Sequence, residues 1–101
     1  MYAIALIRYR RPLEEVFTAL EPHRAYLREL KQRGLLLASG PLDPRSGGML
    51  LLRVPDDAVQ ATLDRIRDED PYTSLGLAQY EVWPWAVVLG KEELDGLRNE
   101  K

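Results

Sequence analysis

Residues 2–9, YAIALIRY, are the segment that most restricts what this chain can fold into. Successive side chains of a β-strand point to opposite faces of the sheet. Read as a strand, the segment is apolar on both faces: one holds Tyr2, Ile4 and Leu6, and the other holds Ala3, Ala5 and Ile7. Strands of this kind are typical of the middle of a sheet that is covered on both sides. The segment therefore predicts a central strand.

Hydrophobic spacing predicts the remaining elements. Pro12 can open a short helical turn, and a helix is predicted from Pro22 to Arg33, with Gly34 as the left-handed residue that ends it. A second helix, capped by Asp56 or Asp57, is predicted from the apolar stripe Val59, Leu63 and Ile66. The further predicted strands are 35–40, 49–54 and 77–88.

The resulting order, β-α-β-β-α-β, is typical of ferredoxin-like folds. Right-handed crossovers place the first and third strands in the centre and the second and fourth at the edges. Pro84 suits an edge strand, because proline has no N–H to donate to a neighbouring strand. We therefore expect an α+β fold with an antiparallel sheet and both helices on one face.

The predicted sheet has one face too many for its helices to cover. We expect the helices to leave open the face of Ala3, Ala5 and Ile7, together with one side of residues 49–54. The simplest cover for an apolar sheet face is a second copy of the chain, packed sheet to sheet. The sequence therefore predicts a homodimer.

Composition bounds the classes of function. A length of 101 residues fits one domain, expected at 1–89, followed by a charged tail or helix at 90–101. The absence of cysteine excludes disulfides, thiolate nucleophiles and thiolate metal sites. A net charge of −2, with one short basic run at 8–11, argues against nucleic-acid binding. A cytoplasmic location is the default expectation for a chain without cysteine. The apolar N-terminal run precedes its charges, which is the reverse of a secretory signal, and it is too short to span a membrane.

His23 is the only histidine in the chain and lies just inside the predicted helix 22–33. It shares a helix face with Tyr26, Leu27 and Leu30, so it points toward the sheet at the rim where the helix begins. A histidine on an apolar stripe is more often a core residue than a catalyst. General acid–base catalysis is the functional alternative, and the residues alone leave both open.

Asp70 also has two interpretations. An aspartate followed by proline is typical of a helix N-cap and a first-turn proline, as in Asp70-Pro71. The alternative is a carboxylate that holds an imidazole in one tautomer and stabilises its protonated form. The predicted topology permits a meeting with His23, since the second helix ends near the end of the sheet where the first begins.

Other candidate residues carry weaker signals. Ser39 lacks the setting of a nucleophile elbow, and Gly47 and Gly48 lack the lysine of a phosphate loop and predict a turn. One histidine with scattered carboxylates makes no recognisable metal site. Trp83 and Trp85 share one side of the last strand, as part of an interface or a pocket wall.

The stretches HRAYLRELKQRGLLLASGPL at 23–42 and DPYTSLGLAQYEVWPW at 70–85 resemble the YCII-related domain family, or YciI-like proteins. The resemblance runs from the first strand to about Val88. It rests on the histidine that opens the first long helix, the Gly-Pro after the second strand, and the Asp-Pro-Tyr before the last strand.

This resemblance implies a dimeric ferredoxin-like α/β barrel with a pocket where a histidine and an aspartate face each other. Carried over to this chain, the pair is His23 and Asp70, and the expected substrate-binding residues around it are Ser39, Gly40, Pro41 and Tyr72. One branch of the family is similar to dehydrochlorinases that remove HCl from chlorinated hydroxylated aromatics, and related barrels include lactone isomerases. The extra apolar turn PLEEVFTAL departs from the pattern and bears on the pocket mouth.

Three functions are compatible with these features. The first is a small cofactor-free enzyme, without a metal, in which His23 is the general acid or base and Asp70 orients it, for an elimination or an isomerisation. The second is a non-catalytic dimeric domain that binds a small organic molecule with the same pair. The third is a structural dimer with a buried His–Asp pair. The fold alone does not choose among them.

Overall fold

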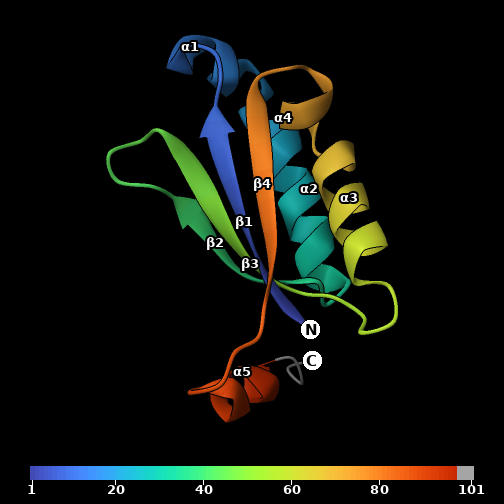
Figure 1. Cartoon of the computed structure of the whole chain (residues 1–101). Coiled ribbons are helices and arrows are strands. Elements are labelled where there is room, and N and C mark those ends of the chain that lie inside the picture. Colours follow the sequence, from blue (N-terminus) through green and yellow to red (C-terminus); the bar gives the residue numbers. More distant parts are fainter. Residues whose placement is uncertain (98–101) are drawn as a thin grey trace.

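The computed structural model describes residues 1–97 and has the predicted ferredoxin-like order, with three added short helices and one 3₁₀ turn (Figure 1). The elements are β1 (Tyr2–Tyr9), α1 (Leu13–Val16), the 3₁₀ turn η1 (Phe17–Ala19), α2 (Leu20–Gln32), β2 (Leu36–Pro41), β3 (Gly47–Arg53), α3 (Val59–Glu69), α4 (Pro71–Ser74), β4 (Ala78–Trp85) and α5 (Lys91–Leu97). None of the helices in this part of the chain is long and apolar enough to cross a membrane.

The four strands form one antiparallel sheet in the order β2-β3-β1-β4. The central position of β1 and β3 is confirmed. Pro84 lies opposite Ala3 on the edge strand β4, where its missing N–H leaves no gap in the interior of the sheet. The α+β, ferredoxin-like fold class is thus confirmed.

Helices α2 and α3 lie together on one face of the sheet (Figure 1). The residues of β1 beneath them are Ala3, Ala5 and Ile7, which are all buried in the core. The expectation that these residues face away from the helices is therefore wrong. Alanine side chains are short, so the two helices can approach the middle of the sheet closely, while the larger Ile4 and Leu6 point to the other face.

Two predicted helix starts differ from the structure. α2 begins at Leu20, because η1 leads directly into it, and Pro22 falls in the first turn, where its missing N–H costs no hydrogen bond. The residue before α3 is Ala58, with no side-chain cap, so the predicted cap at Asp56 or Asp57 is wrong. Asp56 lies in the preceding turn and binds the N-terminal amine at 2.5 Å instead. The left-handed Gly34, with a φ of 78°, is confirmed.

The predicted turn at Gly47 and Gly48 is wrong, because these glycines are the first two residues of β3. A Cβ atom at Gly47, which pairs with Arg8, would collide with the carbonyl oxygen of Ile7 in the adjacent strand β1. Only glycine allows the two backbones to come this close.

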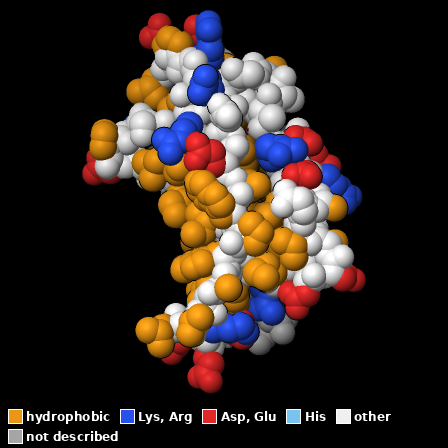
Figure 2. Space-filling view, in the orientation of Figure 1, with side chains coloured by type: hydrophobic (Ala, Val, Ile, Leu, Met, Phe, Trp, Pro, Cys, Tyr) orange, Lys and Arg blue, Asp and Glu red, His pale blue; other side chains and the backbone are white. Residues whose placement is uncertain are grey.

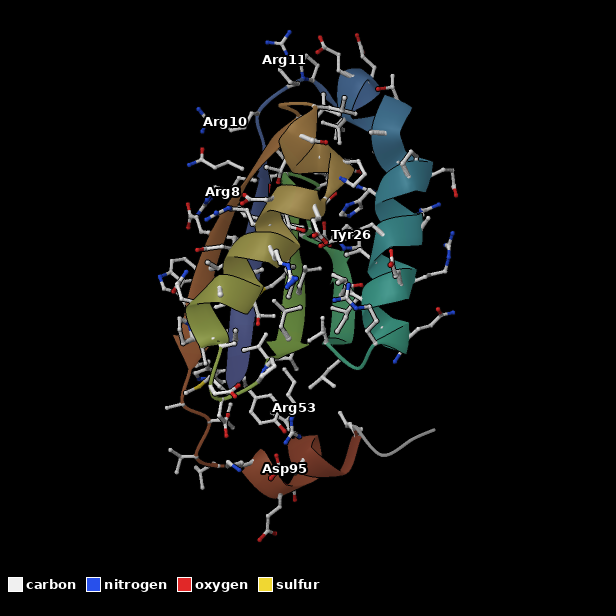
Figure 3. All side chains as sticks on the ribbon, turned by 90° about the vertical axis from the view of Figure 1, so that its right-hand side faces the viewer. Arg8, Arg10, Arg11, Tyr26, Arg53 and Asp95 are labelled. Atoms are coloured by element: carbon white, nitrogen blue, oxygen red, sulfur yellow. The ribbon has the colours of Figure 1, made fainter. Side chains whose placement is uncertain are left out.

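The helix α5 is attached at the end of the sheet opposite to α1 (Figure 1). Asp95 accepts a hydrogen bond from the hydroxyl of Tyr2 at 2.5 Å and lies 3.6 Å from the guanidinium of Arg53. Figure 3 shows Arg53 and Asp95 next to each other at this end. The charged segment predicted at 90–101 thus contains a helix, while its last four residues lie outside the described part.

Candidate functional site

His23 lies in the second turn of α2, on the face that the helix turns toward the sheet. It is buried together with Tyr26 and Leu30, as the helical spacing predicted. The hydroxyl of Tyr26 donates a hydrogen bond to the carbonyl oxygen of Ile66 in α3 at 2.8 Å, and Figure 3 shows Tyr26 between the two helices. This bond ties α2 to α3 on the helix face that also carries the imidazole.

Asp70 caps α4 and meets His23 with the same carboxylate. Its Oδ1 accepts the N–H of Tyr72 at 2.9 Å, and Pro71 occupies the first position of the helix. The same Oδ1 lies 2.9 Å from Nδ1 of His23. The two interpretations of Asp70 are therefore compatible, because a capping carboxylate has lone pairs to spare for an imidazole.

The second oxygen of Asp70 is also engaged. The hydroxyl of Tyr80 in β4 donates to Oδ2 at 2.5 Å, and the Asp70 side chain is fully buried. Three donors from α2, α4 and β4 thus surround one carboxylate, which meets the requirement that a buried charge be paired and hydrogen-bonded. Burial and the neighbouring Asp70 raise the pKa of Tyr80, so its hydroxyl stays protonated and keeps donating at neutral pH.

The partners of Asp70 determine the tautomer of His23. An ionised carboxylate only accepts hydrogen bonds, so Nδ1 of His23 carries the proton, and Nε2 of the neutral ring holds a lone pair. The ring stacks on Tyr72, with centroids 3.9 Å apart and planes 7° from parallel. Asp70 therefore holds the ring at Nδ1 and Tyr72 packs on its flat face, which leaves Nε2 as the available nitrogen. This is the arrangement of an acid–base dyad.

His23 and Tyr72 border a cavity of about 240 Å³ between α2 and the sheet. The predicted residues Ser39, Gly40 and Pro41 line the same cavity, and Asp70 lies behind the imidazole. The structure therefore brings all six predicted site residues together from α2, β2 and α4. Their roles in binding and catalysis stay predictions.

A bulge in β2 directs Ser39 and Pro41 toward this cavity. Strict alternation would put Leu36, Ala38 and Gly40 on one face. The register shifts between Leu36 and Ala38, so that Ser39 pairs with Leu50 and Pro41 pairs with Gly48. The shift exchanges the faces of the strand, which is a common use of bulges beside binding sites.

The cavity contains residues that the sequence did not single out, among them Tyr9, Arg24 and Arg45. Tyr80, which supports Asp70 from β4, was missed as well. Alternation along β4 indicates which face Tyr80 takes, but nothing local indicates that Asp70 lies above it. Within residues 1–97, no three side chains of His, Asp and Glu gather in a way that could hold a metal ion.

Comparisons with known proteins agree with this fold. The model of the YCII-related domain family matches residues 1–86. No curated protein sequence is matched. Among solved structures, the chain is similar to 5-chloro-2-hydroxyhydroquinone dehydrochlorinase (TftG) from Burkholderia phenoliruptrix AC1100, in complex with 2,5-dihydroxybenzoquinone. The two share 25% sequence identity with a TM-score of 0.66, over 87% of this chain and 96% of that one.

Proposed function

The chain belongs to the YCII-related domain family, and we propose that it is a small enzyme that catalyses proton transfer on a small cyclic organic compound. The observation that carries the proposal is the buried hydrogen bond of 2.9 Å between Nδ1 of His23 and Asp70, at the wall of a cavity. A dyad of this kind contributes about 10²–10⁴-fold to a rate.

In the proposed reaction, Nε2 of His23 removes a proton from the bound compound. For a dehydrochlorination, the electron pair of that bond forms a new double bond and chloride leaves. The imidazolium is stabilised by the Asp70 carboxylate and then passes its proton to water. For an isomerisation, the same imidazolium returns the proton to another atom of the compound.

The size and chemistry of the cavity support a compound with a single ring. Its volume is about 240 Å³, and its walls include the apolar side chains of Ile7, Leu20, Leu27 and Leu50. The structural neighbour TftG acts on a chlorinated hydroxyhydroquinone and holds a one-ring quinone. We therefore propose an elimination on a hydroxylated ring as the first reaction to test.

The test is chloride release from 5-chloro-2-hydroxyhydroquinone by the purified protein. We expect His23→Asn and Asp70→Asn to lower the rate by about 10²-fold or more. Asparagine is as good an N-cap as aspartate, so Asp70→Asn separates the chemical role of the carboxylate from its capping role. Full activity in both variants would contradict the dyad.

A broader screen covers compounds other than this one. A small-molecule library is tested by thermal shift against the wild type and His23→Ala. Loss of every stabilising compound in the variant supports a site at His23, whereas unchanged results would place binding elsewhere. Binding at His23 without turnover of any bound compound would instead support the alternative function, a non-catalytic ligand-binding domain.

We further propose that a second copy of the chain covers the face of the sheet that the helices leave open. This open face holds Ile4, Leu6, Met49, Leu51, Trp83 and Trp85. Trp83 and Trp85 are 51% and 42% exposed, which is unusual for tryptophan in a lone chain. Figure 2 shows hydrophobic side chains gathered along the hollowed side of the molecule. Large exposed apolar patches mark interaction surfaces, and a homodimer is the simplest assembly.

A further inference from the structure

The charged residues of the His23 cavity all have the same sign. Its lining includes Arg24 and Arg45, and within the described residues no aspartate or glutamate belongs to the lining. The whole chain, in contrast, has a net charge of −2. A cavity lined by one sign of charge attracts ligands of the opposite sign.

Arg45 is the arginine whose charge is not already balanced. Arg24 lies 3.3 Å from Glu21 and forms an ion pair with it. Arg45 forms no ion pair within residues 1–97: its guanidinium lies over the ring of Phe17, 5.0 Å from the centroid, and its Nε donates to the hydroxyl of Tyr9 at 3.4 Å. These contacts orient the guanidinium while leaving its other N–H groups free to bind an acceptor.

Tyr72 supplies a second observation, independent of charge. Its hydroxyl is buried and has no hydrogen-bond partner among the described residues, although the side chain lines the cavity and stacks on His23. A buried hydroxyl without a partner is costly and calls for an explanation. Burial raises the pKa of Tyr72 to about 12, so at neutral pH this hydroxyl is a donor without an acceptor.

We propose that the cavity selects an anionic ligand, the phenolate or enolate form of a small hydroxylated ring, whose oxyanion is bound by Arg45 and the Tyr72 hydroxyl. This inference rests on the proposed function, because it names the ionisation state of the compound on which His23 acts. An oxyanion supplies the acceptor that the Tyr72 hydroxyl and the remaining N–H groups of Arg45 lack within residues 1–97. It also complements the positive charge that forms on His23 when Nε2 takes up a proton.

The experiment is an NMR titration with a pair of probes near pH 7. The anionic probe is 2,5-dihydroxybenzoquinone, whose enolic hydroxyls are acidic and ionised, and the neutral probe is hydroquinone, a ring of similar size. We expect the wild type to bind the anionic probe more tightly. This preference should fall as salt is added, because the guanidinium is exposed and screened by ions.

Variants then assign the preference to residues. Arg45→Gln should weaken binding of the anionic probe by about fivefold to tenfold and leave the neutral probe unchanged, while Arg45→Lys should keep part of the effect. Tyr72→Phe should weaken binding of the anionic probe by about threefold to tenfold. Arg10→Gln is the matched control, because Arg10 lies outside the cavity lining and points away from α2 (Figure 3). Circular dichroism of each variant checks that it is folded.

Equal binding of both probes, unchanged by Arg45→Gln but lost in His23→Ala, would overturn the inference and leave the proposed function standing. Binding of neither probe to the wild type at millimolar concentration would count against both.

Discussion

The two faces of the sheet are built by opposite rules. The face under α2 and α3 carries the small Ala3 and Ala5, and above it lies the buried, fully hydrogen-bonded carboxylate of Asp70. The open face carries Met49, Trp83 and Trp85, which stay exposed.

This difference separates a face that the single chain covers from a face that it leaves uncovered. On the covered face, the helices exclude water and supply donors, so the carboxylate of Asp70 is buried and hydrogen-bonded. On the open face, apolar area is present without a cover. We therefore expect changes on the covered face to affect the stability of the single chain, and changes on the open face to affect association.

The largest expected effect compares two neighbouring leucines of β3. Leu50 is buried on the covered face, whereas Leu51 is half-buried on the open face. Leu50→Ala should lower the free energy of unfolding by about 2–5 kcal/mol, because it leaves a cavity in the core. Leu51→Ala should cost clearly less at protein concentrations where the chain is monomeric. Denaturant unfolding at two concentrations measures both, and equal, concentration-independent costs would remove the distinction between the faces.

The next effect concerns association alone. Trp83→Glu places a charge on the open face and should weaken a sheet-to-sheet dimer by about 2 kcal/mol or more, as expected for a central aromatic residue. Sedimentation velocity at micromolar concentration follows the dimer. Ala61→Glu, which adds the same charge on the exposed side of α3, is the control. A wild type that sediments as a clean monomer would refute the dimer itself.

A smaller effect compares two tyrosines on the covered side. Tyr80→Phe removes the donor to Oδ2 of Asp70 and should lower the free energy of unfolding by about 1–3 kcal/mol, since it leaves a buried carboxylate oxygen unpaired. Tyr72→Phe removes a hydroxyl that has no partner and should leave stability unchanged or raise it. Thermal and urea unfolding compare the two. A loss in Tyr72→Phe as large as that in Tyr80→Phe would mean that the Tyr72 hydroxyl has a partner in solution.

The smallest expected effect is on how steeply the free energy of unfolding falls with rising pH in the alkaline range. Burial raises the pKa of Tyr72 to about 12, whereas a tyrosine in the unfolded chain ionises near pH 10. The folded state therefore holds this proton more tightly, so the contribution to stability is complete below about pH 10 and is lost as the pH rises toward about 12. Tyr72→Phe should make the fall in stability over this window shallower. An unchanged slope would contradict the assignment to Tyr72.

Much of the fold could be predicted from the sequence because its signals are local. The left-handed Gly34 at the end of α2, the Asp70-Pro71 start of α4 and the edge position of Pro84 each depend on the backbone chemistry of one or two residues. The helical spacing from His23 to Leu30 likewise requires only the period of a helix. The meeting of His23 and Asp70 was predicted by family resemblance, because nothing local joins residues 47 positions apart.

Tertiary structure alone decided which face of β1 the helices cover. Both alternating sets of residues in β1 are apolar. The alternation therefore separates the two faces of the strand but does not indicate which of them the helices cover. The choice depends on side-chain volume against the packed helices, where Ala3 and Ala5 fit. In the same way, the bulge in β2, the close approach at Gly47 and the position of Arg45 on the cavity follow from how separate strands meet in space. Such contacts are set by the packing of neighbours that are distant in the chain, for which one sequence segment carries no pattern.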